Sequence, residues 1–197
     1  MTRPTPPNAK PLPLRVASAL VRDARKLAKA VNFGRLYGMG PAGLRRYARG
    51  SYGIEMTAGE AERYWRGFFE TYPGLKAWHD REYRELKKGS TETRTLTDRR
   101  RTSVTKLTER LNSPVQGTGA DGLKLALAYL WERRYEFPEV APIIAVHDEI
   151  VVEIDAEEVE AGKAWVERCI LDGMAEVLGP AAPVSVEVSV ASNWGEK

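Results

Sequence analysis

A long helix-forming run near the start of the chain most limits what this sequence can fold into. The pattern turns helical at about Val16 and continues through RVASALVRDARKLAKAVNFGRLYG, with no proline or glycine before Gly34. Gly38 and the pair Gly40-Pro41 then interrupt it, as residues that end helices do. The first part of the fold is therefore predicted to be helical.

Local signals predict further helices downstream. A capping-box pattern, Thr57 followed three residues later by Glu60, starts the clearest of them, which should run to about residue 71. Other helices are expected at 42–48, 75–88, 119–135 and 157–178. No internal repeat is visible.

Three segments favour strands or loops over helices. TETRTLTDRRRTSV at 91–104 is rich in threonine and arginine, and VSVEVSV at 184–190 alternates as a strand does. APIIAVHDEIVVEID at 141–155 places two apolar runs around a polar tip, which predicts a β-hairpin. The predicted fold class is therefore α+β, a mostly helical part followed by an antiparallel hairpin with packed helices.

The net charge of +3 conceals two oppositely charged halves. Residues 1–110 hold 24 Lys and Arg against 11 Asp and Glu, or +13, whereas residues 111–197 hold 6 against 16, or −10. The basic half indicates a polyanionic partner, and the alternative is that the two halves attract each other. Since five of the twelve prolines fall in residues 1–14, we predict a disordered leader (1–15), a basic helical segment (16–110) and an acidic segment (111–197).

The cysteine content and the hydropathy pattern exclude several classes of protein. Cys169 is the only cysteine, so the chain can hold neither an internal disulfide nor a multi-cysteine metal site, and a small buried side chain is its expected role. No apolar run is long enough to span a membrane, and the N-terminus lacks the apolar core of a signal peptide. These features predict a soluble cytoplasmic protein without a membrane partner.

Four side chains spaced four residues apart, Arg25, Lys29, Phe33 and Tyr37, form a stripe along the first helix. Each step of four residues turns about 400°, so the stripe drifts slowly around the helix over roughly 18 Å. Two cations followed by two aromatic rings match a nucleoside triphosphate, because Arg and Lys bind phosphate oxygens and a ring packs on sugar and base. If the helix begins near Arg22, its N-terminal partial charge adds to this attraction.

The alternative is that the two cations are solvated while the two aromatic rings belong to a core. Two glycines argue against this alternative. Gly34 and Gly38 interrupt an otherwise good helix at a cost of about 1 kcal/mol each relative to alanine. Glycine is expected at these positions if backbone or bases must approach closely.

The tip of the predicted hairpin carries two adjacent acidic residues, Asp148 and Glu149. A carboxylate at a strand end suits a divalent cation such as Mg²⁺, which takes hard oxygen ligands and is often shared with substrate phosphates. The apolar runs on either side predict burial close to the acids, and buried carboxylates need partners. The alternative is a solvated turn, in which His147 is a satisfied polar residue rather than a group that contacts a ligand.

Two polar clusters add candidate contacts to nucleic acid. LNSPVQGTGADGLKLAL places Asn112 and Gln116 around a proline-containing entry to a helix, where amide groups could hydrogen-bond base edges. Helix capping by Asn112 or Ser113 is the alternative. The arginine triplet at positions 99–101 suits either phosphate contact or a solvated loop.

Taken in order, these segments resemble the C-terminal part of a family A DNA polymerase, the bacterial DNA polymerase I type. The resemblance covers about residues 21–194 and rests on R-x-x-x-K-x-x-x-N-F-G-x-x-Y-G at 25–38, T-L-x-x-R-R-R at 95–101, N-S-P-V-Q-G-T-G-A-D at 112–121 and V-H-D-E at 146–149. Four ordered motifs are too specific for a structural helical domain with accidental matches. The resemblance implies a fingers-like segment at 16–110 and a distal palm-like segment at 111–197.

The resemblance also implies a role for each matching residue. Lys29 and Asp148 would be catalytic, Lys29 as an acid that assists pyrophosphate departure and Asp148 as a metal ligand beside Glu149, with Mg²⁺ as the cofactor. The nucleotide-binding residues would be Arg25, Lys29, Phe33 and Tyr37. The DNA-binding residues would be Asn112, Gln116, His147, Arg99, Arg100 and Arg101. The implied reaction is template-directed nucleotidyl transfer from a deoxynucleoside triphosphate to a primer 3′-hydroxyl, as in DNA replication and repair.

Departures from the family pattern limit this expectation. The family's other catalytic carboxylate should lie upstream of the helix that carries Lys29, yet residues 1–21 contain no acidic residue. Asp98 also stands where a glycine is usual before the arginine triplet. Adjacent Asp148 and Glu149 point to opposite faces if both are extended, so one hairpin tip is not expected to hold the two ions, about 3.5–4 Å apart, of a two-metal mechanism.

We therefore expect the chain alone to bind nucleotide or DNA weakly and to polymerise poorly or not at all. Two alternatives remain open at this point. The chain is either a non-catalytic binding remnant or one part of a split polymerase that needs a partner chain for the rest of the palm and the thumb.

Overall fold

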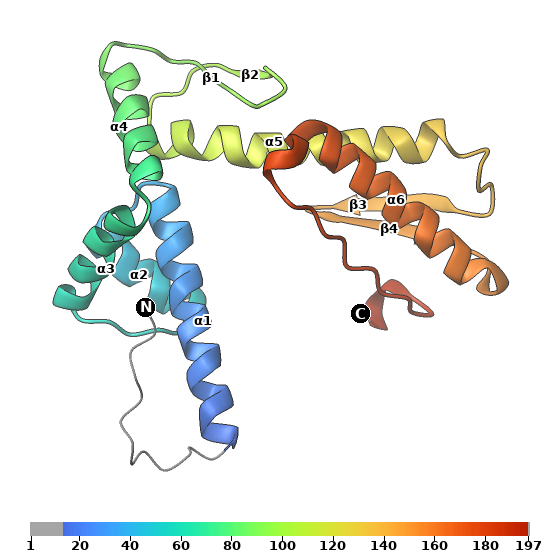
Figure 1. Ribbon diagram of the computed structural model, residues 1–197, viewed down its shortest axis with the longest axis horizontal. Helices are drawn as coiled ribbons and strands as arrows, with labels where there is room; N and C mark the ends of the chain where they lie inside the picture. The colour runs from blue at the N-terminus through green and yellow to red at the C-terminus, as the bar shows by residue number, and fades with distance from the viewer. Residues whose placement is uncertain (1–13, 197) are drawn as a thin grey trace. The chain divides into compact units, whose positions relative to one another are not determined.

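The structure is a computed structural model that describes residues 14–196, with side chains for residues 22–180 and 182–196. The described chain forms two compact units (Figure 1). The first takes the residues up to Gly89 together with Lys106–Leu111, and the second takes Ser90–Thr105 and the residues from Asn112 onward. Helices dominate and the strands form two small antiparallel pairs, which confirms the predicted α+β class.

The first unit is helical, as its sequence predicts. It comprises α1 (Leu14–Leu36), α2 (Pro41–Tyr52), α3 (Ala58–Thr71) and α4 (Pro73–Lys87). The capping box forms at the start of α3, where Thr57 and Glu60 each accept a hydrogen bond from the other's backbone N–H. Apart from the last two residues of the predicted leader, Leu14 and Arg15, which already belong to α1, that segment lies outside the described residues.

Small apolar residues bring the helices of this unit together. Its buried cluster consists of Ala30, Leu44, Ala48, Met56 and Ala61. A Cβ on Gly34 would lie only 3.1 Å from the Leu44 side chain, so glycine lets α1 and α2 approach here. Gly38 has φ of +82°, a left-handed conformation in which glycine ends α1. Both glycines therefore have a structural role in the packing of α1.

The buried face of α1 carries an arginine, Arg35. Arg35 is 2% exposed, and its guanidinium lies 4.5 Å from the Trp65 ring and 4.2 Å from the Phe69 ring. Nη1 donates to the Met39 carbonyl at 2.9 Å, whereas Nε and Nη2 find no hydrogen-bond partner within the described residues. Burial lowers the pKa of Arg35 to about 10. The charge is thus balanced by aromatic faces rather than by hydrogen bonds to all of its donors.

We expect Arg35→Met to raise the free energy of unfolding by about 1–2 kcal/mol. The substitution removes two unsatisfied buried donors, at about 1–3 kcal/mol each, and loses cation–π attraction of about 2 kcal/mol while keeping most of the volume. The gain should be complete at neutral pH and should shrink above about pH 10, where the folded protein begins to release the Arg35 proton. Urea denaturation at pH 7 and pH 10.5 measures both effects.

Arg35→Ala serves as the comparison, because it also removes the side chain that fills the space between the aromatic rings. We expect this variant to be less stable than Arg35→Met. A methionine variant less stable than the parent protein would show that the cation–π contacts outweigh the unsatisfied donors.

The second unit contains both strand pairs and two long helices. Its elements are β1 (Thr93–Arg94), β2 (Arg100–Arg101), most of α5 (Leu107–Glu132), β3 (Ala141–Val146), β4 (Glu149–Glu153) and α6 (Val159–Leu178), with short 3₁₀ helices at Ala156–Glu158, Gly179–Ala181 and Trp194–Glu196. Its buried cluster consists of Leu130, Val140, Trp165, Val166 and Cys169, so the predicted burial of the cysteine is confirmed. Burial also raises the pKa of the Cys169 thiol.

The start of α5 differs from the prediction. The helix was expected to follow Pro114, but it begins at Leu107 and runs through the proline. Leu111 is fully buried, and Arg110 forms a buried ion pair with Glu82, so tertiary contacts hold the first two turns of α5 despite the backbone hydrogen bond that proline cannot make. Asn112 and Ser113 therefore lie inside the helix, and the capping alternative for them is wrong.

The predicted strand at 184–190 is also wrong. The segment keeps a two-residue alternation between half-buried and exposed side chains, but it belongs to no strand, and the described sheets are the pairs β1–β2 and β3–β4. Alternation of apolar and polar residues indicates only which side chains share a face. A strand in a sheet also requires a neighbouring backbone with which to form hydrogen bonds.

None of the helices in the described part of the chain has the length and apolar composition that crossing a bilayer requires.

Candidate functional site

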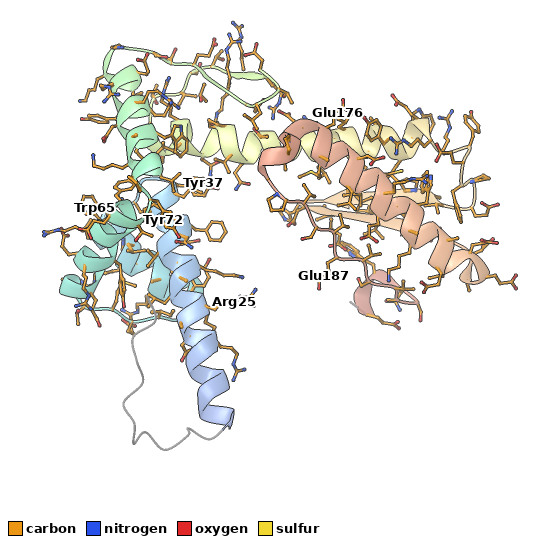
Figure 2. The ribbon with its side chains drawn as sticks, viewed as in Figure 1. Arg25, Tyr37, Trp65, Tyr72, Glu176 and Glu187 are labelled. Carbon is orange, nitrogen blue, oxygen red and sulfur yellow. The ribbon has the colours of Figure 1, made fainter. Side chains whose placement is uncertain are left out.

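The predicted stripe lies along an exposed edge of α1. Arg25 and Lys29 are exposed, and Phe33 is 44% exposed, so the ring does not belong to a core. Tyr37 is half-buried and lies one residue past the helix, where its N–H donates to the Phe33 carbonyl at 3.4 Å. Figure 2 shows Arg25 projecting from α1 and Tyr37 at the end of that helix. The structure thus places the two cations and Phe33 together on an accessible surface.

The helix dipole does not strengthen this edge as expected. The sequence argument required α1 to begin near Arg22, but the helix begins at Leu14. Because the partial charge of a helix terminus acts within about one turn, Arg25 and Lys29 lie too far along the helix to share it. Attraction for phosphate must come from the two side chains themselves.

A polar pocket in the second unit brings together most of the predicted DNA-binding residues. The pocket is about 210 Å³ and lies between the β1–β2 hairpin and α5. Its lining residues are Thr93, Arg94, Thr95, Arg99, Arg101, Asn112, Ser113, Gln116 and Gly117. Asn112 and Gln116, one helical turn apart on α5, therefore face the same space as two of the three predicted arginines.

The arginine triplet does not form one cationic patch. Arg99 donates from Nε to Asp121 at 2.6 Å and from Nη2 to the Gly117 carbonyl at 3.0 Å. Arg101 donates to the Ser113 hydroxyl at 2.8 Å, whereas Arg100 pairs with Glu92 at 3.4 Å and does not line the pocket. Arg100 and Arg101 are the two residues of β2, and successive side chains of a strand point to opposite faces, which separates Arg100 from Arg101.

Asp121 fastens the hairpin to α5. Besides Arg99, it accepts a hydrogen bond from the Thr97 hydroxyl at 2.7 Å. Burial acts to raise the pKa of Asp121, but hydrogen bonds from Thr95, Thr97 and Arg99 outweigh it and hold that pKa below its ordinary value. A Cβ on Gly117 would lie 2.6 Å from Thr95 Cγ2, so glycine lets the hairpin lie directly on the helix. These contacts hold the wall of the pocket, formed by the β1–β2 hairpin, in a defined position on α5.

The unusual residue before the triplet has a conformational explanation. Asp98 adopts φ of +64°, the left-handed conformation that favours glycine, at the turn between β1 and β2. Aspartate tolerates this conformation better than most residues, and its carboxylate accepts a hydrogen bond from Arg94 Nη1 at 2.6 Å. The departure from glycine therefore keeps the shape of the turn.

The second hairpin forms as predicted. β3 and β4 pair with Val146 opposite Glu149, which leaves His147 and Asp148 as the two turn residues. His147 has φ of +55°, a strained conformation for a residue other than glycine, and both turn side chains are exposed. Glu149 accepts a hydrogen bond from the Trp194 indole N–H at 3.1 Å. The two adjacent acids therefore have different surroundings.

Burial around these acids is lower than the sequence predicts. The side chains of β4 are half-buried except that of Glu153, and Ile150 and Val152 pack on the core cluster of the unit. In contrast, β3 is exposed over all of its residues except Val146. Ile143 is 50% exposed and Ile144 is 37% exposed. The core cluster of the unit contacts apolar residues of β4 and none of β3, which leaves Ile143 and Ile144 of β3 accessible to solvent.

The residues present make only part of a metal site. Asp148 and Glu149 supply carboxylate oxygens of the kind that Mg²⁺ takes. Among the described residues, however, no three His, Cys, Asp or Glu side chains lie close enough to hold a metal ion. The donor set is therefore incomplete for a divalent cation within the described chain.

Sequence reasoning missed several residues of the pocket. Arg94 and Ser113 line it, and Asp121 orders its wall. A signal for Asp121 was present, because it is the only acidic residue between Glu109 and Glu132 and follows a run of small residues. An isolated acid in such a run, one helical turn after Gly117, indicates a partner from another element.

Comparison with known proteins identifies the family of this chain. The model of the family "DNA polymerase family A" matches residues 14–196. DNA polymerase I of Aquifex aeolicus is 37% identical over 177 residues, which are 89% of this chain and 30% of that protein. The thermostable DNA polymerase I of Thermus aquaticus is 35% identical over 182 residues, 86% of this chain and 20% of that protein. The chain therefore spans between a fifth and a third of these curated relatives.

A solved structure shares the fold. The POL domain of Pol1 from M. smegmatis, in complex with DNA primer-template and dNTP, aligns with a TM-score of 0.62 at 21% identity. The alignment covers 78% of this chain and 27% of that one. Since the family model matches all of the described residues and confirms the resemblance seen in the four motifs, this protein belongs to DNA polymerase family A.

Proposed function

We propose that this chain forms the nucleotide-binding fingers and the distal palm of a template-directed DNA polymerase. The reaction is nucleotidyl transfer from a deoxynucleoside triphosphate to the 3′-hydroxyl of a primer, in cytoplasmic DNA replication or repair. The segments 16–110 and 111–197 are the two functional parts. The observation that carries the proposal is the exposed edge of α1, where Arg25, Lys29 and Phe33 are accessible to a ligand in a family A protein.

The chemistry of this edge suits a nucleoside triphosphate. Arg25 offers a planar fork of donors and Lys29 a compact charge, both of which bind phosphate oxygens. Phe33 and Tyr37 follow toward the end of the helix and would pack on sugar and base. Lys29 would also assist pyrophosphate departure by donating a proton.

The pocket of the second unit supports primer–template as the other ligand. Asn112 and Gln116 would hydrogen-bond base edges, and Arg99 and Arg101 would contact phosphates beside them. Arg100 would contact phosphate from the other face of the hairpin, and His147 would lie near the primer end. The M. smegmatis protein, which shares the fold, was solved with DNA primer-template and dNTP.

Catalysis requires more carboxylates than the described chain brings together. Members of the family use Mg²⁺, which neutralises the charge that develops on the transferring phosphate. Asp148, with Glu149 beside it, would supply one side of that site, and carboxylates from outside the described residues would supply the other. A non-catalytic nucleotide- and DNA-binding protein is the second candidate, favoured by the absence of a three-residue metal cluster from the described residues.

Replacing Lys29 with alanine is expected to weaken binding of a deoxynucleoside triphosphate about tenfold, because a charge-assisted contact to phosphate contributes about 1.4 kcal/mol at an exposed site. Binding of primer–template should change by less than about twofold. Titration calorimetry with dATP and fluorescence anisotropy with a labelled primer–template measure the two affinities. Lys26→Ala is the matched control, since Lys26 is an exposed lysine on α1 outside the stripe. Equal effects of the two substitutions would contradict the assignment of the edge.

Primer extension distinguishes the two candidate functions. With Mg²⁺ and all four deoxynucleoside triphosphates, we expect no extension by the chain alone and extension after addition of a protein that supplies the remaining palm carboxylate. Binding of both ligands without extension under either condition would favour the non-catalytic protein. Extension by the chain alone would disprove the need for a partner.

A further inference from the structure

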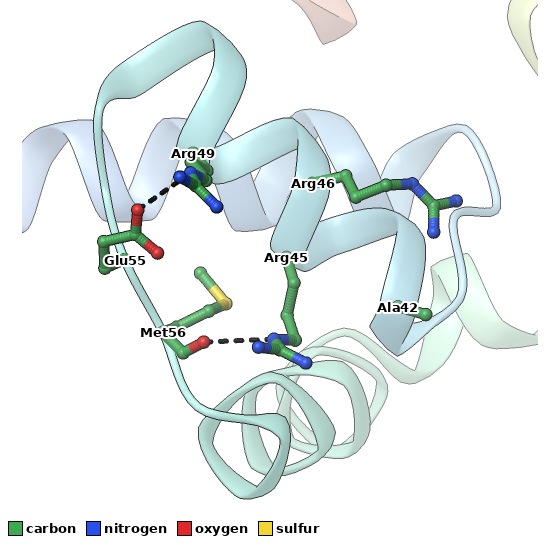
Figure 3. Close-up of a pocket in the computed structure, with 6 residues that line it drawn as sticks. All are labelled: Ala42, Arg45, Arg46, Arg49, Glu55 and Met56. Carbon is green, nitrogen blue, oxygen red and sulfur yellow. Dashed lines mark hydrogen bonds and ion pairs between the residues drawn. The ribbon is translucent and has the colours of Figure 1, made fainter.

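A second pocket, lined by basic residues, lies on α2 and includes none of the residues of the α1 edge described above. The cavity is about 240 Å³ and is lined by Ala42, Arg45, Arg46, Arg49, Glu55 and Met56 (Figure 3). Its three arginines come from little more than one turn of α2, and the facing wall is the segment between α2 and α3. All of these residues belong to the first unit. None of them lies in the motifs that identify the family.

Several guanidinium N–H groups of the pocket have no hydrogen-bond acceptor among the described residues and could bind an anion. Arg45 donates from Nε to the Met56 carbonyl at 3.1 Å, which fixes its side chain and leaves its two terminal nitrogens available within the described chain. Arg46 makes no hydrogen bond or ion pair with any described residue. Three guanidinium groups against one carboxylate give the pocket a net charge of +2.

The single internal carboxylate is held loosely. Arg49 Nε pairs with Glu55 Oε1 at 2.9 Å, but both side chains are 75% exposed, and an ion pair of this kind contributes little to stability. A phosphate group could therefore replace Glu55 as the partner of Arg49 at small cost. Arg45 and Arg49, one helical turn apart on α2, can then donate to the same group, and Arg46 adds a third charge to the wall of the pocket.

We propose that the α2 pocket, built on Arg45, Arg46 and Arg49, binds a phosphodiester group of single-stranded DNA. The cavity is too small for more than about one phosphate with its sugar, given that pockets for drug-sized molecules begin near 300 Å³. A single strand is flexible enough to turn one phosphate into a concave site of this size, and positively charged surfaces that follow its backbone bind it without sequence preference. This proposal depends on the proposed function in one respect, namely that the polyanion bound by the chain is a nucleic acid.

Fluorescence anisotropy of the full chain with labelled oligothymidylate tests this proposal. We expect Arg46→Gln to weaken binding of the single strand about threefold to tenfold and to reduce the magnitude of the slope of log K against log [salt] by about 0.7, the value for one phosphate contact. Because Arg46 has no partner in the described chain, the substitution should leave the melting temperature unchanged. Glu55→Gln should tighten binding, since it removes the carboxylate that competes for Arg49. A blunt duplex should bind both variants within about twofold of the parent chain.

Arg66→Gln is the matched control, because Arg66 is an exposed arginine on α3 that lies outside the pocket. Equal weakening by Arg46→Gln and Arg66→Gln would overturn the proposal by showing a diffuse effect of charge. Weakened binding of free dATP or inorganic phosphate with unchanged binding of oligothymidylate would also overturn it. Failure of the parent chain to bind a primer–template would instead count against the proposed function. Normal primer–template binding with no effect of Arg46→Gln on the single strand would count against the α2 pocket alone.

Discussion

Replacing Gly173 with alanine is expected to lower the free energy of unfolding of the second unit by about 3 kcal/mol. Gly173 lies on α6 where that helix meets α5, and a Cβ there would lie 2.7 Å from Ala126 Cα, 2.9 Å from the Leu125 carbonyl carbon and closer still to the Ala126 nitrogen. All three atoms belong to the backbone of α5, so no rotamer change can relieve the overlap. The strain of separating the helices exceeds the roughly 1 kcal/mol that alanine gains over glycine in a helix. Urea denaturation followed by circular dichroism measures the change, and the melting temperature of this unit should fall by about 12–24 °C.

Gly67→Ala provides the matched comparison. Gly67 also lies in the middle of a helix, α3, but a Cβ there would meet no heavy atom within 4 Å outside its own helix. This variant should gain up to about 1 kcal/mol, because alanine loses less conformational freedom on folding. If Gly173→Ala behaved like Gly67→Ala, the close approach of α5 and α6 would be disproved.

Replacing Glu82 with alanine is expected to destabilise the first unit by about 3 kcal/mol. Glu82 Oε2 accepts a hydrogen bond from Arg110 Nε at 2.9 Å, and the two side chains are 13% and 6% exposed. Removing one partner of a buried ion pair costs about 3–5 kcal/mol, because the remaining charge loses the carboxylate that balances it away from water. The pair also joins α4 to the first turn of α5, two segments 28 residues apart. Thermal and urea denaturation should both report the loss.

The neighbouring exposed ion pair gives the control for this second prediction. Asp80 pairs with Lys76 at 2.7 Å on the same helix, and their side chains are 50% and 56% exposed. Solvent screens this pair, so Asp80→Ala should change the free energy of unfolding by less than about 1 kcal/mol. A loss of the same size in both variants would mean that charge on α4, rather than the buried pair, determines stability.

Most helices could be predicted because their signals are local. The Thr57–Glu60 capping box starts α3 as expected, and Gly38 ends the helical run through its left-handed conformation. The β3–β4 hairpin follows from two apolar runs around a polar tip. Each of these features depends on residues within a few positions of one another.

Two elements were predicted wrongly for one shared reason. Pro114 indicates a helix start, yet contacts of Arg110 and Leu111 with distant residues hold an earlier turn in place. The segment 184–190 alternates correctly but has no partner strand within the described residues. In both cases the outcome depends on the presence or absence of contacts that are far away in the sequence.

The candidate site also has one part that the sequence predicted and one part that it did not. Spacing by four residues was enough to place Arg25, Lys29 and Phe33 on one edge of α1, and the structure leaves that edge exposed. The arginine triplet, by contrast, is one block in the sequence but is distributed in space among Asp121, Glu92 and Ser113. Whether the edge of α1 and the hairpin pocket act in nucleotide transfer stays a proposal that the binding measurements decide.

The sequence by itself determined the helical first part, the spacing of the stripe on α1 and the hairpin that carries Asp148, and its four motifs indicated the family. Periodicity, caps and motif spacing are properties of residues close together in the sequence, so they can be recognised without knowledge of the fold. Only the tertiary structure decided that α5 passes through Pro114, that Arg35 is buried among aromatic rings, and that Asp121 holds Arg99 in the pocket wall. The burial and the hydrogen-bond partners of a polar group depend on which distant segments pack against it, and those segments are brought together only by folding.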